Sequence, residues 1–159
     1  MPSALSKAVL WAAIAIVLPA ALISASISAV LQARNVVAAR HMTVYTSPLC
    51  GCCIEWIDYM KTTRFQVEVV FRSDMAAVRH EYNIPDDVAS CHTAVIGRYF
   101  VEGHMPAEAI DKLLLEKPDI DGIALAGMPA GSPGMPGPKE APFVIVALSR
   151  SEQSIFMID

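Results

Sequence analysis

The chain lacks any cluster of basic residues. Three of its 12 Lys and Arg residues precede His41, so the rest of the chain has nine basic residues against 16 acidic ones. A protein that binds nucleic acid needs a basic surface to contact the phosphates, and an excess of acidic residues opposes that contact. We therefore expect no nucleic-acid partner.

Charge is also missing from a long stretch near the N-terminus. The run 8–33, between Lys7 and Arg34, contains no Asp, Glu, Lys or Arg. About 20 apolar residues can cross a bilayer core, whereas a cleavable signal has a shorter apolar centre of roughly 7 to 15 residues. Residues 1–40 are therefore predicted to be a hydrophobic helix that acts as a signal peptide or, as its length favours, a membrane anchor. Residues 41–159 are then a periplasmic domain, either soluble or held at the inner membrane by the run 8–33.

The sequence has no internal repeat, and residues 42–117 show short strand and helix patterns in alternation. Strands are predicted at 42–45, 65–71, 93–96 and 99–102, and helices at 53–60, 75–82 and 106–114. Ser73 or Asp74 can cap the second of these helices. The predicted order β-α-β-α-β-β-α, with cysteines between the first strand and the first helix, is the layout of a thioredoxin-like α/β domain.

The C-terminal part adds two features to this layout. Residues 122–142 are rich in Pro and Gly and predict an irregular surface loop. Residues 143–158 predict a closing β-hairpin.

Three of the four cysteines lie within four positions, at Cys50, Cys52 and Cys53. In the predicted fold they end a loop and begin a helix, where unpaired backbone N–H groups and the helix dipole favour thiolates. Cys50 and Cys53 have the spacing of a thioredoxin redox pair. Cys52 is an additional thiol that redox chemistry does not require.

The proline that thioredoxins place before their third strand is missing. His92 takes its position, directly after the fourth cysteine, Cys91. A proline lacks an N–H donor and keeps the backbone close to the disulfide, so its absence weakens the redox interpretation and leaves room for a ligand. Cys91 can then complete a four-thiol pocket.

The cysteine pattern suits a soft metal. Adjacent residues such as Cys52 and Cys53 cannot easily direct both sulfurs at one tetrahedral ion, and structural zinc sites pair cysteines two to four residues apart. Thiolates that bridge several Cu(I) ions fit crowded sulfurs better, and several monovalent ions bring four thiolates close to neutrality. The pattern favours more than one Cu(I) ion.

Four stretches carry a resemblance to a known family. In order, the chain contains SPLCGCCIEW (47–56), ASCHTAVI (89–96), VEGHMPAEAI (101–110) and GMPAGSPGM (127–135). The combination resembles the CopG-type family of exported, thioredoxin-like copper-binding proteins associated with bacterial copper resistance, from about residue 42 to the C-terminus. The resemblance implies that the copper ligands are Cys50, Cys52, Cys53 and Cys91.

Four other side chains are candidates for an auxiliary role. His104 could cover the metal site or carry protons, or it could cap a helix; His92 could tune the site or satisfy backbone groups in the core. Met128 and Met135 are thioether donors for Cu(I), although methionines in such loops also attach the loop to the core.

Three functions remain open for the cysteines. The first is copper binding in copper resistance or homeostasis, which makes the chain a metal-binding protein more than an enzyme, with other exported copper-handling proteins as candidate partners. The second is a thiol-disulfide oxidoreductase that uses Cys50 and Cys53. The third is structural disulfides, which an even cysteine count permits in an oxidising compartment. Metal stoichiometry and disulfide-exchange activity distinguish the three.

Overall fold

The computed structural model describes residues 40–150 and 152–159. The predicted N-terminal signal or anchor lies outside these residues. Within them, no helix is both long and apolar enough to span a bilayer.

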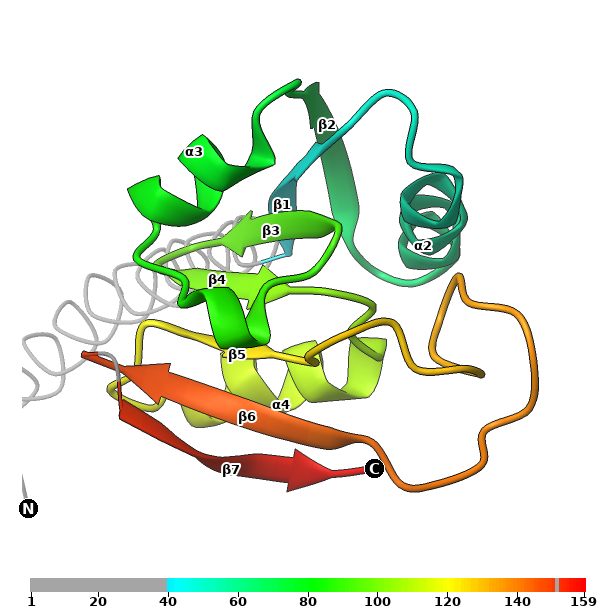
Figure 1. The fold of residues 1–159 in the computed structure, drawn as a ribbon. Coiled ribbons are helices and arrows are strands. Elements are labelled where there is room, and N and C mark those ends of the chain that lie inside the picture. The colour runs from blue at the N-terminus through cyan, green and yellow to red at the C-terminus, as the bar shows by residue number, and fades with distance from the viewer. Residues whose placement is uncertain (1–39, 151) are drawn as a thin grey trace, which may run out of the picture. The chain divides into compact units, whose positions relative to one another are not determined.

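The described residues form one seven-stranded mixed sheet with the order β2-β1-β3-β4-β5-β6-β7 (Figure 1). The elements in chain order are β1 (His41–Thr46), α2 (Gly51–Thr62), β2 (Gln66–Phe71), α3 (Met75–Glu81), the 3-10 turn η1 (Asp86–Val88), β3 (His92–Ile96), β4 (Tyr99–Glu102), α4 (Ala107–Glu116), β5 (Gly122–Ala124), β6 (Val144–Ser149) and β7 (Glu152–Ile158). From β1 to α4, the strands and helices follow the order β-α-β-α-β-β-α expected from the sequence.

Strand β5 corrects the expectation that residues 122–142 are irregular throughout. Its three residues pair in parallel with β4 and antiparallel with β6, and all three are buried. So short a segment beside Gly and Pro has no readable periodicity, and only its neighbours in the sheet make it a strand. Through β5, the C-terminal hairpin β6–β7 joins the rest of the sheet.

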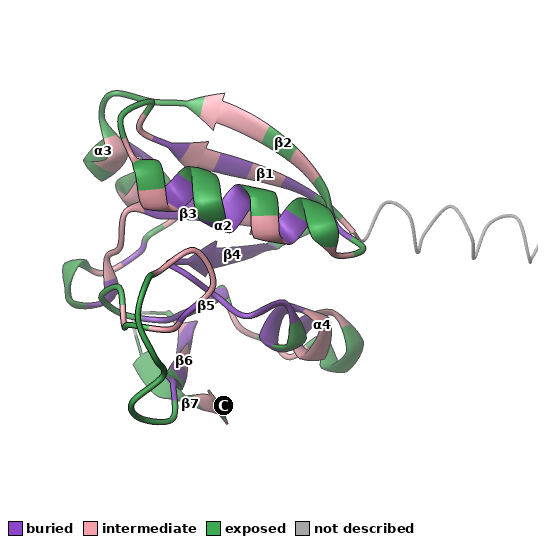
Figure 2. Cartoon of the chain, turned by 90° about the vertical axis from the view of Figure 1, so that its right-hand side faces the viewer, coloured by how far each residue is buried: buried purple, intermediate pink, exposed green. Residues whose placement is uncertain are grey.

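The helices cover both faces of the sheet. Trp56, Ile57 and Met60 of α2 and Ile110 of α4 pack in one core cluster, together with alternate strand residues such as Val101. The opposite face has a smaller cluster between the strands and the segment from α3 to η1, which includes Ile84, Val88, Phe100, Ala124 and Leu148. Figure 2 shows the buried stripe of α2 facing the sheet.

Helices α2 and α3 differ in how their N-termini are capped. The Asp74 carboxylate accepts a hydrogen bond from the Ala77 N–H at 3.0 Å, which confirms the predicted cap of α3. Helix α2 begins differently, because its N-cap residue is Cys50, which makes no side-chain capping bond. The first turn of α2 contains no acidic residue, so its N–H groups face the thiols without a competing carboxylate.

Candidate metal centre

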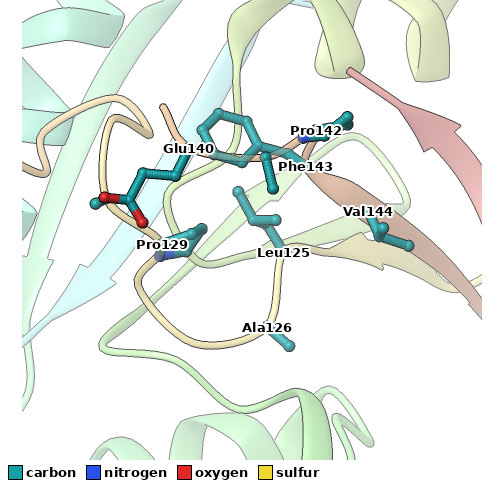
Figure 3. Close-up of a pocket in the computed structure, with 9 residues that line it drawn as sticks. Leu125, Ala126, Pro129, Glu140, Pro142, Phe143 and Val144 are labelled. Atoms are coloured by element: carbon teal, nitrogen blue, oxygen red, sulfur yellow. The ribbon is translucent and has the colours of Figure 1, made fainter. Parts of the chain in front are cut away.

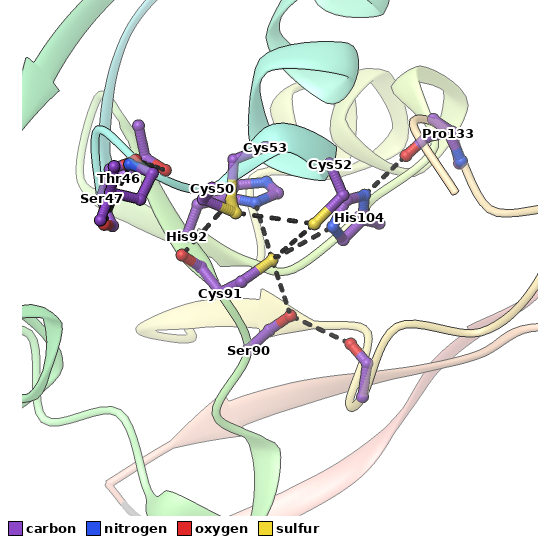
Figure 4. The surroundings of a disulfide bond; sticks show 12 residues. Thr46, Ser47, Cys50, Cys52, Cys53, Ser90, Cys91, His92, His104 and Pro133 are labelled. Atoms are coloured by element: carbon purple, nitrogen blue, oxygen red, sulfur yellow. Dashed lines mark hydrogen bonds between the residues drawn. A yellow bond between two sulfur atoms is a disulfide. The ribbon is translucent and has the colours of Figure 1, made fainter. Parts of the chain in front are cut away.

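Two segments bring the four cysteines together. Cys50 ends the loop after β1, Cys52 and Cys53 lie in the first turn of α2, and Cys91 lies in the loop before β3. The four sulfurs all lie within 4.8 Å of one another. Cys52 is in the middle, 3.6 Å from the Cys50 sulfur and 3.8 Å from the Cys91 sulfur (Figure 4). The fold therefore forms the four-sulfur pocket that the sequence predicts.

A disulfide joins two of the four cysteines. It connects Cys50 to Cys53, while Cys52 and Cys91 are free thiols. The Cys50–Cys53 pairing is the one expected for a redox pair with two intervening residues. The loop that contains Cys91, and strand β3 that begins at His92, have only trans peptide bonds, like the rest of the described chain. The peptide bond between Cys91 and His92 is therefore trans.

The His92 side chain is fully buried beneath the cluster. Its ring lies against the Trp56 indole in a tilted arrangement, with the ring centres 4.4 Å apart, and its Nδ1 lies 3.7 Å from the Cys91 sulfur. Burial, and then the neighbouring His104, lower the pKa of His92 to about 3. Its Nε2 is buried and has no hydrogen-bond partner among the described residues. A neutral imidazole with a free ring nitrogen thus lies next to the thiols.

His104 makes the closest contact between a ring nitrogen and a thiol. Its Nε2 lies 3.2 Å from the Cys91 sulfur, and its Nδ1 lies 2.7 Å from the Pro133 carbonyl oxygen. A carbonyl oxygen only accepts hydrogen bonds, so Nδ1 carries the proton and the Nε2 lone pair faces Cys91. Burial lowers the pKa of His104, while the bond to Pro133 opposes that shift. Cys91, His92 and His104 form a second group whose ligand atoms lie within 4.8 Å of one another.

The Pro/Gly-rich segment, residues 122–142, contributes to the site through its backbone. Besides the Pro133 carbonyl, the Gly127 carbonyl accepts a hydrogen bond from the Ser90 hydroxyl at 3.0 Å. Gly134 has a φ of +79°, and a Cβ there would lie 2.6 Å from the backbone nitrogen of Trp56. The segment around Gly134 therefore lies directly on α2.

The two candidate methionines are less closely placed than the histidines. Met128 is 50 % exposed, and Met135 is half-buried. Within the described chain, the close contacts of the cysteine sulfurs involve other cysteines, the Cys91 carbonyl, Ser90, His92 and His104, but neither methionine.

Glu102 is a residue of this region that sequence reasoning missed. It ends β4, it is fully buried, and its carboxylate accepts hydrogen bonds from the Ser90 N–H at 2.7 Å and the Thr93 hydroxyl at 2.6 Å. Burial raises the pKa of Glu102 to about 7, although both hydrogen bonds oppose the shift. Its signal in the sequence is weak, because a glutamate at the end of a strand normally faces solvent.

Burial also acts on the free thiol of Cys91. It raises the pKa of Cys91 to about 12, with a further contribution from the nearby Cys52 thiol. In the metal-free disulfide form, Cys91 is therefore a neutral thiol at pH 7.

A separate surface pocket of about 380 Å³ is lined by residues within the stretches 125–130 and 140–144 (Figure 3). Its lining is mostly apolar and includes Leu125, Pro129, Pro142, Phe143 and Val144, with Glu140 at one side. None of the four cysteines lines it.

Comparison with known proteins gives two kinds of match. A family model described as "Protein of unknown function, DUF411" matches residues 88–135. The chain is also similar to the solved structure "Copper resistance protein copG- Form 2", with 40% identity and a TM-score of 0.70 over 75% of this chain and 97% of that chain. "Copper resistance protein copG- Form 1" gives 39% identity and a TM-score of 0.69 over 75% of this chain and 96% of that chain. No curated protein sequence matches.

Proposed function

Because the chain belongs to the CopG-type family of copper resistance proteins, we propose that it binds copper through Cys50, Cys52, Cys53 and Cys91. The observation that carries this proposal is the gathering of all four sulfurs within 4.8 Å of one another. Thiolates are soft ligands that suit Cu(I), zinc and iron–sulfur clusters, and the copper resistance proteins among the structural matches favour Cu(I) among these.

The spacing of the sulfurs suits ions that share ligands. A metal–sulfur bond of roughly 2.3 Å in a tetrahedral site places two sulfurs roughly 3.8 Å apart. Cys52 lies at such distances from both Cys50 and Cys91. One sulfur placed between two others is the arrangement expected of a bridging thiolate, so we propose that the site holds more than one Cu(I) ion. His104 and His92 are its auxiliary nitrogen donors, and Met128 and Met135 are candidates for copper transfer.

The Cys50–Cys53 disulfide gives this copper site two states. Full binding by four thiolates requires an external dithiol, which reduces the Cys50–Cys53 disulfide to two thiols and is itself oxidised to a disulfide. Cu(I) then displaces the protons of the two thiols into solvent. In the disulfide form, Cys52 and Cys91 are the remaining free thiols. We infer that reduction increases the copper capacity of the domain.

An anaerobic Cu(I) titration against a competing chelator tests the proposal. The reduced protein should take up more than one copper per chain, with thiolate-to-copper charge-transfer absorption, and the disulfide form should take up fewer. Saturation of the reduced protein at one ion would disprove the polynuclear site. Tighter binding of zinc than of Cu(I) would disprove the copper assignment.

A thiol-disulfide oxidoreductase is the second candidate, and the Cys50–Cys53 disulfide favours it. Against it stands His92, whose peptide bond is trans and which takes the place where thioredoxins have a cis-proline. We therefore expect slow turnover in an insulin-reduction assay. Turnover comparable to that of a thioredoxin would make this the leading function.

The cellular setting is also part of the proposal. The uncharged run 8–33 supports export to the periplasm, with an uncleaved anchor in the inner membrane. The order of elements from β1 to α4 supports a thioredoxin-like classification of the domain that follows. Fractionation of cells that express the full chain tests the localisation, and recovery in the cytosol would contradict it. Other exported copper-handling proteins are the partners that this location suggests.

A further inference from the structure

Ser90, the residue before Cys91, is held from three directions. Its N–H donates to the Glu102 carboxylate at 2.7 Å, and its hydroxyl donates to the Gly127 carbonyl at 3.0 Å. Its carbonyl oxygen lies 3.5 Å from a guanidinium nitrogen of Arg79, a residue of α3. Ser90 thus connects β4, α3 and the Pro/Gly-rich segment immediately before the fourth thiol.

Among the three groups that contact Ser90, the Glu102 carboxyl has the largest free-energy cost of burial. Its side chain is fully buried, and a buried carboxyl loses the hydration that it has in water. Both of its oxygens are occupied, one by the Ser90 N–H and the other by the Thr93 hydroxyl. Of the two donors, the Ser90 N–H is the one that connects Glu102 to the loop that carries Cys91.

The position of Glu102 in the sheet explains why its carboxylate contacts Ser90 and Thr93. It pairs directly with Thr93 across β3 and β4, and the Gly103 N–H bonds to the His92 carbonyl. Gly103 has a φ of +84°, and a Cβ there would lie 3.1 Å from Ser90 side-chain atoms. The end of β4 therefore lies against the Cys91 loop through both its backbone and its carboxylate.

We propose that Glu102 is a positioning residue for the fourth thiol, which it holds at the cluster through its hydrogen bond to the Ser90 N–H. In this loop, which lacks a cis-proline, the Glu102–Ser90 bond fixes the backbone that directs the Cys91 sulfur at Cys52 and His104. The inference rests on the proposed copper site for its functional consequence. The geometric part concerns the metal-free protein as well.

Two substitutions of similar size separate this role from packing. Glu102→Gln keeps an oxygen that can accept from the Ser90 N–H, whereas Glu102→Met fills the same space without an acceptor. Loss of the acceptor should weaken binding of the copper ion held by Cys91 by roughly tenfold to a hundredfold. Glu102→Gln should bind copper within roughly threefold of the original protein, because the hydrogen bond to Ser90 remains.

A double-mutant cycle tests whether Glu102 acts through Cys91. In a Cys91→Ser background, Glu102→Met should cause no further loss of copper. Val101→Ala is the matched control, because Val101 is the neighbouring buried residue and packs in the core cluster on the opposite face. It should lower stability and leave copper binding unchanged. Additive losses in the cycle, or equal losses in Val101→Ala and Glu102→Met, would overturn the proposal.

A second readout needs no copper. In the reduced, metal-free protein, the alkylation rate of Cys91 divided by that of Cys52, measured by peptide mass spectrometry, should change about tenfold or more in Glu102→Met. The ratio should stay unchanged in Glu102→Gln and Val101→Ala. An unchanged ratio in Glu102→Met would overturn the inference even if copper binds. A changed ratio in a protein that binds no copper would refute the proposed function alone.

If Glu102→Met does not fold, Glu102→Asp replaces it in both measurements. The aspartate keeps the carboxylate, but it is one methylene too short to reach both Ser90 and Thr93 from the same backbone position. An alkylation ratio and a copper affinity equal to those of the original protein would then overturn the proposal.

Discussion

At the scale of single residues, Cys91 is the residue whose role differs most between the two proposed functions. It is remote in sequence from the other three thiols, yet its sulfur lies 3.8 Å from Cys52 and 3.2 Å from the His104 ring. A redox pair of Cys50 and Cys53 can work without it. A four-thiol copper site cannot.

Cys91→Ser should therefore bind fewer copper ions, or bind them much more weakly, while folding normally. A serine hydroxyl is a hard donor that cannot replace a thiolate for Cu(I), yet it is nearly isosteric with the thiol. Copper per chain from the anaerobic titration is the measurement, with circular dichroism as the control for folding. Unchanged stoichiometry and affinity would remove Cys91 from the ligand set.

Glu102 and His92 have opposite effects on the pH dependence of stability. Burial raises the pKa of Glu102 from 4.5 to about 7, so the folded state holds a proton that the unfolded chain releases, and this group makes stability fall across that range. Burial lowers the pKa of His92 from 6.5 to about 3, so this group makes stability rise with pH up to about 6.5.

Glu102→Gln should remove the fall in stability with rising pH that Glu102 causes, and leave the rise in stability that His92 causes. Relative to the original protein, the variant should gain up to roughly 3 kcal/mol of unfolding free energy between pH 4.5 and 7. Urea unfolding of the metal-free disulfide form at several pH values measures this difference. Parallel profiles for the two proteins would show that Glu102 titrates alike in the folded and unfolded states.

At the scale of elements, the contact between the Pro/Gly-rich segment and α2 shapes the site. The segment supplies the carbonyls that orient His104 and Ser90, and Gly134 brings its backbone against the first turns of the helix. Two conditions favour glycine here. The φ of +79° disfavours other residues, and a Cβ would meet backbone atoms that cannot move independently.

Gly134→Ala should lift the segment from α2 and weaken copper binding. We expect a loss of about 2 to 4 kcal/mol of unfolding free energy, from backbone strain and steric overlap together. Gly97→Ala is the matched control, because Gly97, in the turn between β3 and β4, has a φ of +59° but a Cβ there would meet nothing within 4 Å. Its loss should be about 1 to 2 kcal/mol, with copper binding retained. Equal losses of unfolding free energy in the two variants would show that the close approach of Gly134 to α2 does not contribute to stability.

At the scale of the whole molecule, the site lies where several parts of the fold meet. Its side chains come from the start of α2, the loop before β3, and the turn after β4 (Figure 4). The Pro/Gly-rich segment contacts them through the Pro133 carbonyl, which accepts a hydrogen bond from His104. A ligand that joins these parts binds the folded state and not the separated segments. Copper binding and folding should therefore be coupled.

Cu(I) should raise the thermal midpoint of the reduced protein more than that of the disulfide form. At a free copper concentration about 1,000 times the dissociation constant, one ion adds about 4 kcal/mol of stability. The disulfide form has two free thiols and should gain less. Calorimetry with buffered Cu(I) measures both forms. Equal shifts would indicate that Cys50 and Cys53 do not take part in binding.

The sequence by itself determined the features that depend on local periodicity and spacing. The apolar stripe of α2, the Asp74 cap, the hairpin β3–β4 and the hairpin β6–β7 all follow from patterns within about a dozen residues. The crowding of Cys50, Cys52 and Cys53 indicates a soft-metal or redox site through spacing alone. The place of Cys91 before the third strand predicts that it joins the same pocket.

Only the tertiary structure decided the features that depend on residues distant in sequence. Strand β5 exists because β4 and β6 pair with it, and Glu102 meets the Cys91 loop because the Ser90 N–H lies opposite its carboxylate. His104 presents its Nε2 to Cys91 because a carbonyl 29 residues away accepts from its Nδ1. Hydrogen bonds and desolvation depend on what lies opposite a group in space, and local sequence patterns do not contain that information.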